Sequence, residues 1–85
     1  MKEYQVVATL VDKEVRRVRR YNPGTKIYQT RTRYELTFQY EDLQTKISDR
    51  RLYDQLELGD DVNAILQIQK NDDGNIVKRW LRVRY

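Results

Sequence analysis

Arginine and tyrosine side chains gather in one stretch of the chain, residues 16–33, which reads RRVRRYNPGTKIYQTRTR. The stretch holds seven Lys/Arg and no Asp or Glu. Because guanidinium groups neutralise phosphates and aromatic rings between them stack on bases, this pattern favours nucleic-acid binding, single strands included. Arg and Tyr are also enriched at protein-binding hot spots, so an acidic protein surface is the alternative partner. In a third interpretation the charged side chains only keep an exposed strand hydrated and prevent edge-to-edge association.

The predicted binding surface comes mostly from this stretch, with three arginines from the end of the chain as its extension. Its members are Arg16, Arg17, Arg19, Arg20, Tyr21, Lys26, Tyr28, Arg31, Arg33, Arg79, Arg82 and Arg84. The charge is segregated along the sequence. Residues 1–34 hold nine Lys/Arg and three Asp/Glu (+6), residues 35–61 three and eight (−5), and residues 62–85 five and two (+3). Such segregation predicts a polarised surface if the two basic ends meet in space.

Catalysis is not expected from these residue types. The chain has no His and no Cys, which removes the commonest general base, the commonest transition-metal ligand and any thiolate. The carboxylate pairs Glu41-Asp42, Asp60-Asp61 and Asp72-Asp73 each fall at a predicted turn, where Asp is favoured for local hydrogen bonds. The run NDDGN lacks the ligand spacing of a calcium loop. The sequence therefore predicts a binding protein with no metal and no cofactor.

The elements that must position the basic stretch are mainly strands. The alternation of apolar residues, with turn residues between the runs, predicts five strands and one short helix. In chain order these are strands over 3–20, 27–40 and 43–48, a helix over Arg50–Leu58, and strands over 62–68 and 76–85. Ser48 or Asp49 is the expected N-cap of the helix, and Gly59 its expected terminator. The basic stretch then forms the solvent end of the first β-hairpin.

The order β-β-β-short helix-β-β over residues 1–85 predicts one small domain, a five-stranded β-barrel of OB-like order. An SH3-like barrel is the alternative. The register of the first hairpin depends on its turn, because a two-residue Pro23-Gly24 loop would pair Leu36 with Val11. A loop longer or shorter by one residue would pair Leu36 with Leu10 and join the two even-numbered apolar sets. We expect the longer or bulged loop.

The N-terminal sequence MKEYQVVATLVDKE has too short an apolar run for a signal peptide or a membrane span. With the lack of Cys this favours a cytoplasmic protein without a membrane partner.

Three patches resemble an uncharacterised family of small bacterial β-domains. They are Val11-Asp12-Lys13, the strand Tyr34–Phe38, and Tyr53 followed by Leu56 and Gly59-Asp60. The resemblance spans about the first three quarters of the chain, and the closing hairpin after Ile65 departs from it. Members of this family often carry a membrane anchor ahead of the region, which this chain is expected to lack. The resemblance implies a small β-domain and transfers no site residue, because the family has no assigned activity.

Overall fold

The protein was analysed as a computed structural model that describes residues 1–84. This part of the chain forms five strands and one helix. They are β1 (Lys2–Asn22), β2 (Ile27–Tyr40), β3 (Leu43–Ser48), α1 (Arg50–Gln55), β4 (Asp61–Lys70) and β5 (Ile76–Val83). The predicted order of elements is confirmed, and β1 is longer than predicted at both ends.

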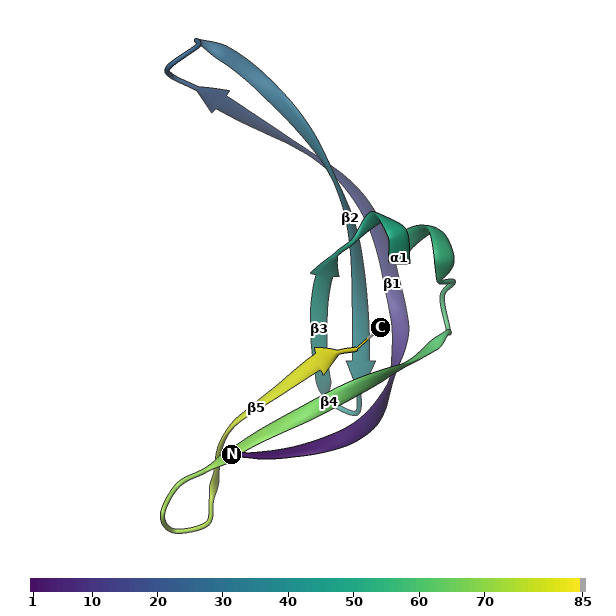
Figure 1. Ribbon diagram of the computed structural model, residues 1–85, viewed down its shortest axis with the longest axis vertical. Helices are drawn as coiled ribbons and strands as arrows, with labels where there is room; N and C mark the ends of the chain where they lie inside the picture. Colours follow the sequence, from purple (N-terminus) through teal and green to yellow (C-terminus); the bar gives the residue numbers. More distant parts are fainter. Residues whose placement is uncertain (85) are drawn as a thin grey trace.

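The strands form one antiparallel sheet in the order β3-β2-β1-β4-β5 (Figure 1). β1 is the central strand because its first part pairs with β4 and its later part with β2. The prediction of a mainly β fold is confirmed, but the sheet is open. Within residues 1–84, β3 and β5 are the two edge strands and share no hydrogen-bonded ladder, so closure into a barrel is not seen.

The core lies on one side of the sheet, under α1. Leu10, Leu36 and Phe38 are fully buried, and Leu52 of α1 packs onto them. We call the side that carries these residues the inner face and the opposite side the outer face. The rest of the buried core is small and consists of Ala8, Ala64 and Leu81. A core of this size suits a short chain with little stability to spare.

The register between β1 and β2 is set by a loop and a bulge. Asn22 pairs with Ile27 across a four-residue loop, so the expected longer loop is confirmed. The ladder shifts by one residue at Val11, and below this bulge Leu10 pairs with Phe38. The two even-numbered apolar sets do join, but the predicted partner of Leu10, Leu36, was wrong by two residues. The loop and the bulge each shift the pairing of β1 with β2, whereas the register predicted from the sequence considered only the loop.

The helix is shorter than predicted. Asp49 is its N-cap, as expected, and accepts a hydrogen bond from the backbone N–H of Leu52 at 3.1 Å. The helix ends at Gln55, and its C-cap Leu56 is extended, so Gly59 does not terminate it. Gly59 instead takes a positive φ of 93° in the following turn and donates its N–H to the carbonyl oxygen of Leu10 at 2.8 Å. This bond fastens the loop after α1 to β1.

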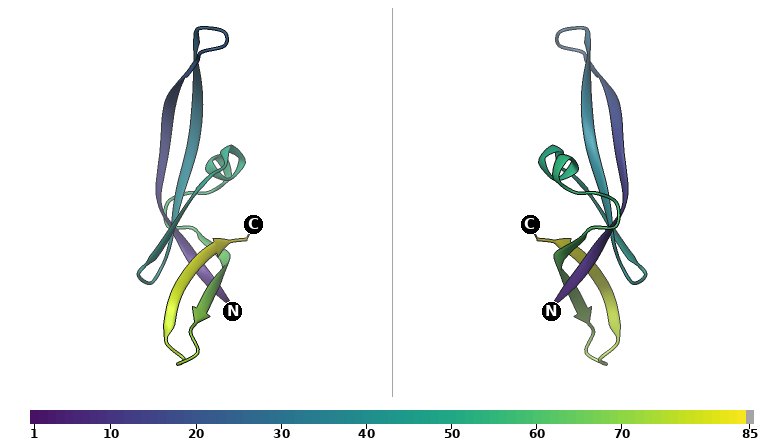
Figure 2. Two further views of the ribbon diagram at one scale, coloured as in Figure 1. Left: turned by 90° about the vertical axis from the view of Figure 1, so that its left-hand side faces the viewer. Right: turned by 90° about the vertical axis from the view of Figure 1, so that its right-hand side faces the viewer.

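The molecule is elongated because the first hairpin projects beyond the rest of the sheet (Figure 2). The radius of gyration over Cα atoms is 16.9 Å, against about 12 Å expected for a compact chain of this length. The extents are 54 × 32 × 18 Å. We call the projecting part, residues 16–33, the arm and the remainder the body.

Candidate functional site

The arm is a two-stranded ribbon with both edges free. β4 pairs with β1 only as far as Thr9, and β3 pairs with β2 only from Glu35 onward. Between these limits, within residues 1–84, the arm strands pair only with each other, from Arg16 opposite Arg33 to the loop. Its tip lies at the far end of the molecule from the β4–β5 hairpin (Figure 1). The ribbon therefore offers two faces and two edges to a partner.

The outer face of the arm is lined by arginines. The bulge at Val11 shifts β1 so that its even-numbered residues beyond the bulge lie on this face. Arg20, Arg31 and Arg33 surround Val18 and line a shallow hollow of about 280 Å³. Arg16, opposite Arg33, completes a group of four guanidinium groups on one face. The three arginines that line the hollow give it a charge that suits an anionic ligand.

The inner face of the arm carries two arginines and the two arm tyrosines. Tyr21 and Tyr28 are opposite each other in the register, and their ring centroids are 5.0 Å apart in a tilted arrangement. The guanidinium carbon of Arg19 lies 5.2 Å from the centroid of the Tyr28 ring. Arg17 lies next along the same face, opposite Thr32. The tyrosine rings are thus engaged with each other and with Arg19.

The base of the arm is fastened to the helix on the inner face. Lys13 donates a hydrogen bond from Nζ to the carbonyl oxygen of Leu56 at 2.8 Å, and its ammonium lies 4.2 Å from the centroid of the Tyr53 ring. Tyr53 in turn makes an edge contact with Tyr34, at 5.3 Å between centroids. Arg50 lies over the ring of Tyr34, with its guanidinium carbon 5.5 Å from the ring centroid. These contacts hold the ribbon where it leaves the body.

A buried carboxylate marks the base of the arm on the outer face. The side chain of Glu35 is 10% exposed and lies directly opposite Glu14. Glu35 Oε1 is 3.8 Å from Arg16 Nη1, and Oε2 is 3.8 Å from Lys46 Nζ. Oε2 accepts no hydrogen bond from residues 1–84. Sequence reasoning missed this cluster, although the alternation of β2 already places Glu35 on the same face as Arg33.

The other cations of the arm are free of acids. Among residues 1–84, the cations that form ion pairs are Arg16, Lys46 and Arg79. The arm cations outside that set are Arg17, Arg19, Arg20, Lys26, Arg31 and Arg33. The acidic segment 35–61 lies away from the tip of the arm, in the last part of β2, in β3, in α1 and in the loops between them. The arm is therefore basic along its whole length.

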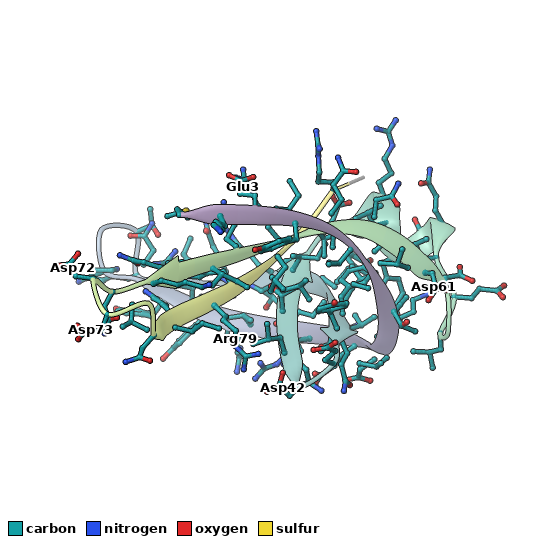
Figure 3. All side chains as sticks on the ribbon, turned by 90° about the horizontal axis from the view of Figure 1, so that it is seen from below. Glu3, Asp42, Asp61, Asp72, Asp73 and Arg79 are labelled. Carbon is teal, nitrogen blue, oxygen red and sulfur yellow. The ribbon has the colours of Figure 1, made fainter. Side chains whose placement is uncertain are left out.

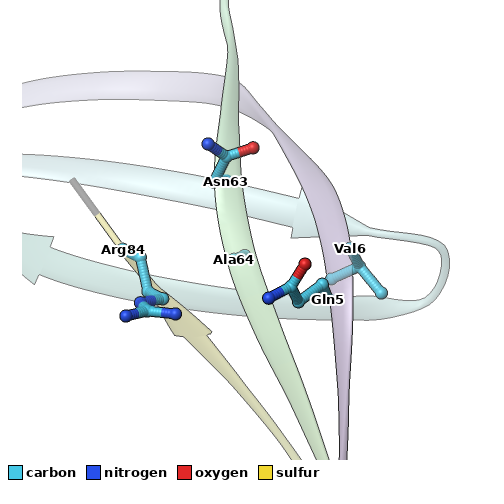
Figure 4. A pocket seen from close by; sticks show the side chains of 5 residues that line it. All are labelled: Gln5, Val6, Asn63, Ala64 and Arg84. Carbon is cyan, nitrogen blue, oxygen red and sulfur yellow. The ribbon is translucent and has the colours of Figure 1, made fainter.

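The C-terminal arginines do not join the arm. Arg79 donates from Nη2 to Asp42 Oδ2 at 2.9 Å, at the β2–β3 turn, which is the opposite end of β2 from the arm loop (Figure 3). Arg84 faces Gln5 across Ala64, at a hollow of about 380 Å³ in the body (Figure 4). Arg82 lines a neighbouring hollow with Glu3. The predicted extension of the arm surface by these three arginines is therefore wrong, since β5 pairs with β4 and not with the hairpin.

Of the carboxylate pairs, Asp60 accepts within its own turn, whereas Asp61 bonds across to β1. Asp60 accepts the backbone N–H of Glu57 at 2.9 Å, and Asp61 accepts the hydroxyl of Thr9 at 2.7 Å. Asp72 and Asp73 lie in the exposed β4–β5 loop, far from Asp61 (Figure 3). Over residues 1–84, no group of three or more acidic side chains is placed to hold a metal ion.

No helix in residues 1–84 has the length and apolarity needed to span a membrane. Searches with protein-family models, curated proteins and solved structures found no match to this chain. The resemblance to small bacterial β-domains stays a prediction.

Proposed function

We propose that this protein is a non-enzymatic binding module that uses the arm to bind nucleic acid. The observation that carries the proposal is the projecting ribbon itself, with seven Lys/Arg, no acid and both edges free. Such a concentration of cations binds phosphates chiefly through the release of condensed counterions. Because the ribbon projects from the body, its cations lie away from the acidic side chains there.

The strand order supports the proposal. The order β3-β2-β1-β4-β5 is that of an OB-like barrel opened between β3 and β5, and we propose that the body is such an open relative. In OB-type proteins the loops between strands 1 and 2 and between strands 4 and 5 contact oligonucleotides. Here the first of these connections is the arm. The second contains Asp72 and Asp73, whose charge disfavours phosphate, so the arm carries the proposed contact alone.

The test is fluorescence anisotropy with labelled single-stranded and duplex oligonucleotides at several salt concentrations. We expect the logarithm of the binding constant to fall linearly with the logarithm of the salt concentration. The slope should be no steeper than about −6 if all seven cations contact phosphate. Replacing one arginine from each face, Arg19→Ala with Arg31→Ala, should weaken binding roughly tenfold and make the slope shallower by about 2. Arg16 is left in place because it neutralises Glu35.

The matched control removes two charges from the body, Lys2→Ala with Lys70→Ala, at exposed positions. It should leave the affinity and the slope close to those of the unchanged protein. If no oligonucleotide binds even at low salt, the nucleic-acid proposal is wrong.

That negative result would favour the second candidate, an acidic protein surface. A specific observation supports it, since the arm also exposes apolar side chains at Val18, Ile27 and Tyr28. Protein partners cover such groups, whereas phosphates do not. Pull-down with the arm intact and with Arg19→Ala and Arg31→Ala would then identify the partner.

A further inference from the structure

We infer that the ligand of the arm is double-stranded DNA, and that the ribbon enters the major groove edge-on with its two faces toward opposite phosphate backbones. The inference deepens the proposed function and rests on it. It is carried by how cations and rings are divided between the two faces.

The division argues against a single strand. Proteins that bind single strands combine phosphate contacts with free aromatic rings on which the bases stack. Within residues 16–33 the outer face holds four arginines and no aromatic residue, because its other members are Val18, Asn22, Ile27 and Gln29. The two tyrosines lie on the inner face and pack against each other. The face richest in cations therefore has nothing on which to stack a base.

The presence of cations on both faces argues for a groove with two walls. A ribbon that lay flat on a ligand would leave either the four outer arginines or Arg17 and Arg19 in solvent. A single sheet layer with its side chains is about 10 Å thick, and the major groove of B-form DNA is about 12 Å wide. The free edges let the ribbon enter edge-on, since no strand within residues 1–84 flanks it. The deep, narrow major groove of an RNA duplex would not admit it.

The base of the arm limits the length of ribbon that can lie in the groove. Glu14 and Glu35 lie opposite each other on the outer face, directly below Arg16 and Arg33. Carboxylates at this position repel phosphate, so contact stops there. The reach from Arg16 to Asn22 is then about 20 Å, less than one turn of the duplex, which is about 34 Å. The arm fits a single passage of the groove.

The experiment compares two variants that each remove two arginines from one face. Arg20→Ala with Arg31→Ala changes the outer face, and Arg17→Ala with Arg19→Ala changes the inner face. All four residues are exposed, so the fold should survive, and circular dichroism checks it. With duplex DNA we expect both variants to lower the salt slope by about 2, because each face contacts its own backbone.

Three ligands of equal length complete the design: duplex DNA, the same duplex with bulky substituents at pyrimidine C5, and one of its strands alone. The C5 position points into the major groove, so the substituents should weaken binding at least tenfold. The single strand should also bind at least tenfold more weakly than the unmodified duplex. Equal affinity for the strand or for the substituted duplex would overturn the inference, as would a change in slope for one variant only. In those cases the proposed function would still stand, whereas failure of all three ligands to bind would remove both.

Discussion

At the scale of single residues, the contact between Asp42 and Arg79 joins the two open edges of the sheet. The hydrogen bond from Arg79 is the main cause that holds the pKa of the Asp42 carboxyl below its ordinary value of 3.8, with a backbone hydrogen bond and the charge of Arg79 adding to it. Because the folded-state pKa lies below the unfolded one, the stabilisation is present above pH 3.8. It is lost as the pH falls through the lower folded-state value.

We therefore expect the carboxyl carbon of Asp42, followed by NMR, to titrate below pH 3.8 in the protein and to return toward that value in Arg79→Ala. Raising the salt concentration should have the same effect, since the pair is exposed and screened by ions. Arg82→Ala serves as the control and should leave the titration unchanged. An Asp42 titration that Arg79→Ala does not move would show that the ion pair does not form in solution.

At the scale of elements, the arm lacks the burial that stabilises the body. Only every second amide of each arm strand faces the other strand, because both outer edges are free, and every residue from Arg16 to Arg33 is exposed. A two-stranded ribbon without a buried face is marginal in water, so the arm should open more readily than the strands around Phe38.

Hydrogen exchange measures this difference. We expect the amides of Val18 and Arg31, which are directly opposite each other, to exchange at least roughly tenfold faster than those of Leu36 and Phe38. Saturating duplex DNA should slow exchange in the arm and leave the core amides almost unchanged. Equal protection in the two regions without ligand would contradict the division into arm and body.

Much of this architecture follows from local patterns in the sequence. The alternation from Tyr34 to Tyr40 predicts β2, and Asp49 predicts the start of α1, because both depend on neighbouring residues alone. The position of the arm and most of its site residues follow from the same patterns. The bulge at Val11 could not be predicted, since it depends on pairing with residues far along the chain. For the same reason the sequence misplaced Arg79, Arg82 and Arg84, whose location is decided by the pairing of β5 with β4.

At the scale of the whole molecule, the shape depends on the arm staying extended. Repulsion among arginines without acidic partners favours this, and the Lys13 and Tyr53 contacts hold the base.

Small-angle X-ray scattering in dilute solution should give a radius of gyration near the 16.9 Å of the structure. An arm folded back onto the body would bring it toward the compact value of about 12 Å. Phe38→Ala, a substitution in the core, should cost about 3–5 kcal/mol of stability. A larger radius of gyration in that variant would report unfolding of the whole chain and not the position of the arm.

The central position of β1 also has a consequence in time. Its first half pairs with β4, and Thr9 and Asp61 are 52 residues apart. During synthesis at about 5–20 residues per second, that half waits roughly 3–10 s for its partner, while the local β1–β2 hairpin can already close. Throughout that interval an edge with Tyr4 and Val7 is open to other chains. The charges of Lys2 and Glu3 on this edge disfavour its pairing with a strand of another chain during that interval.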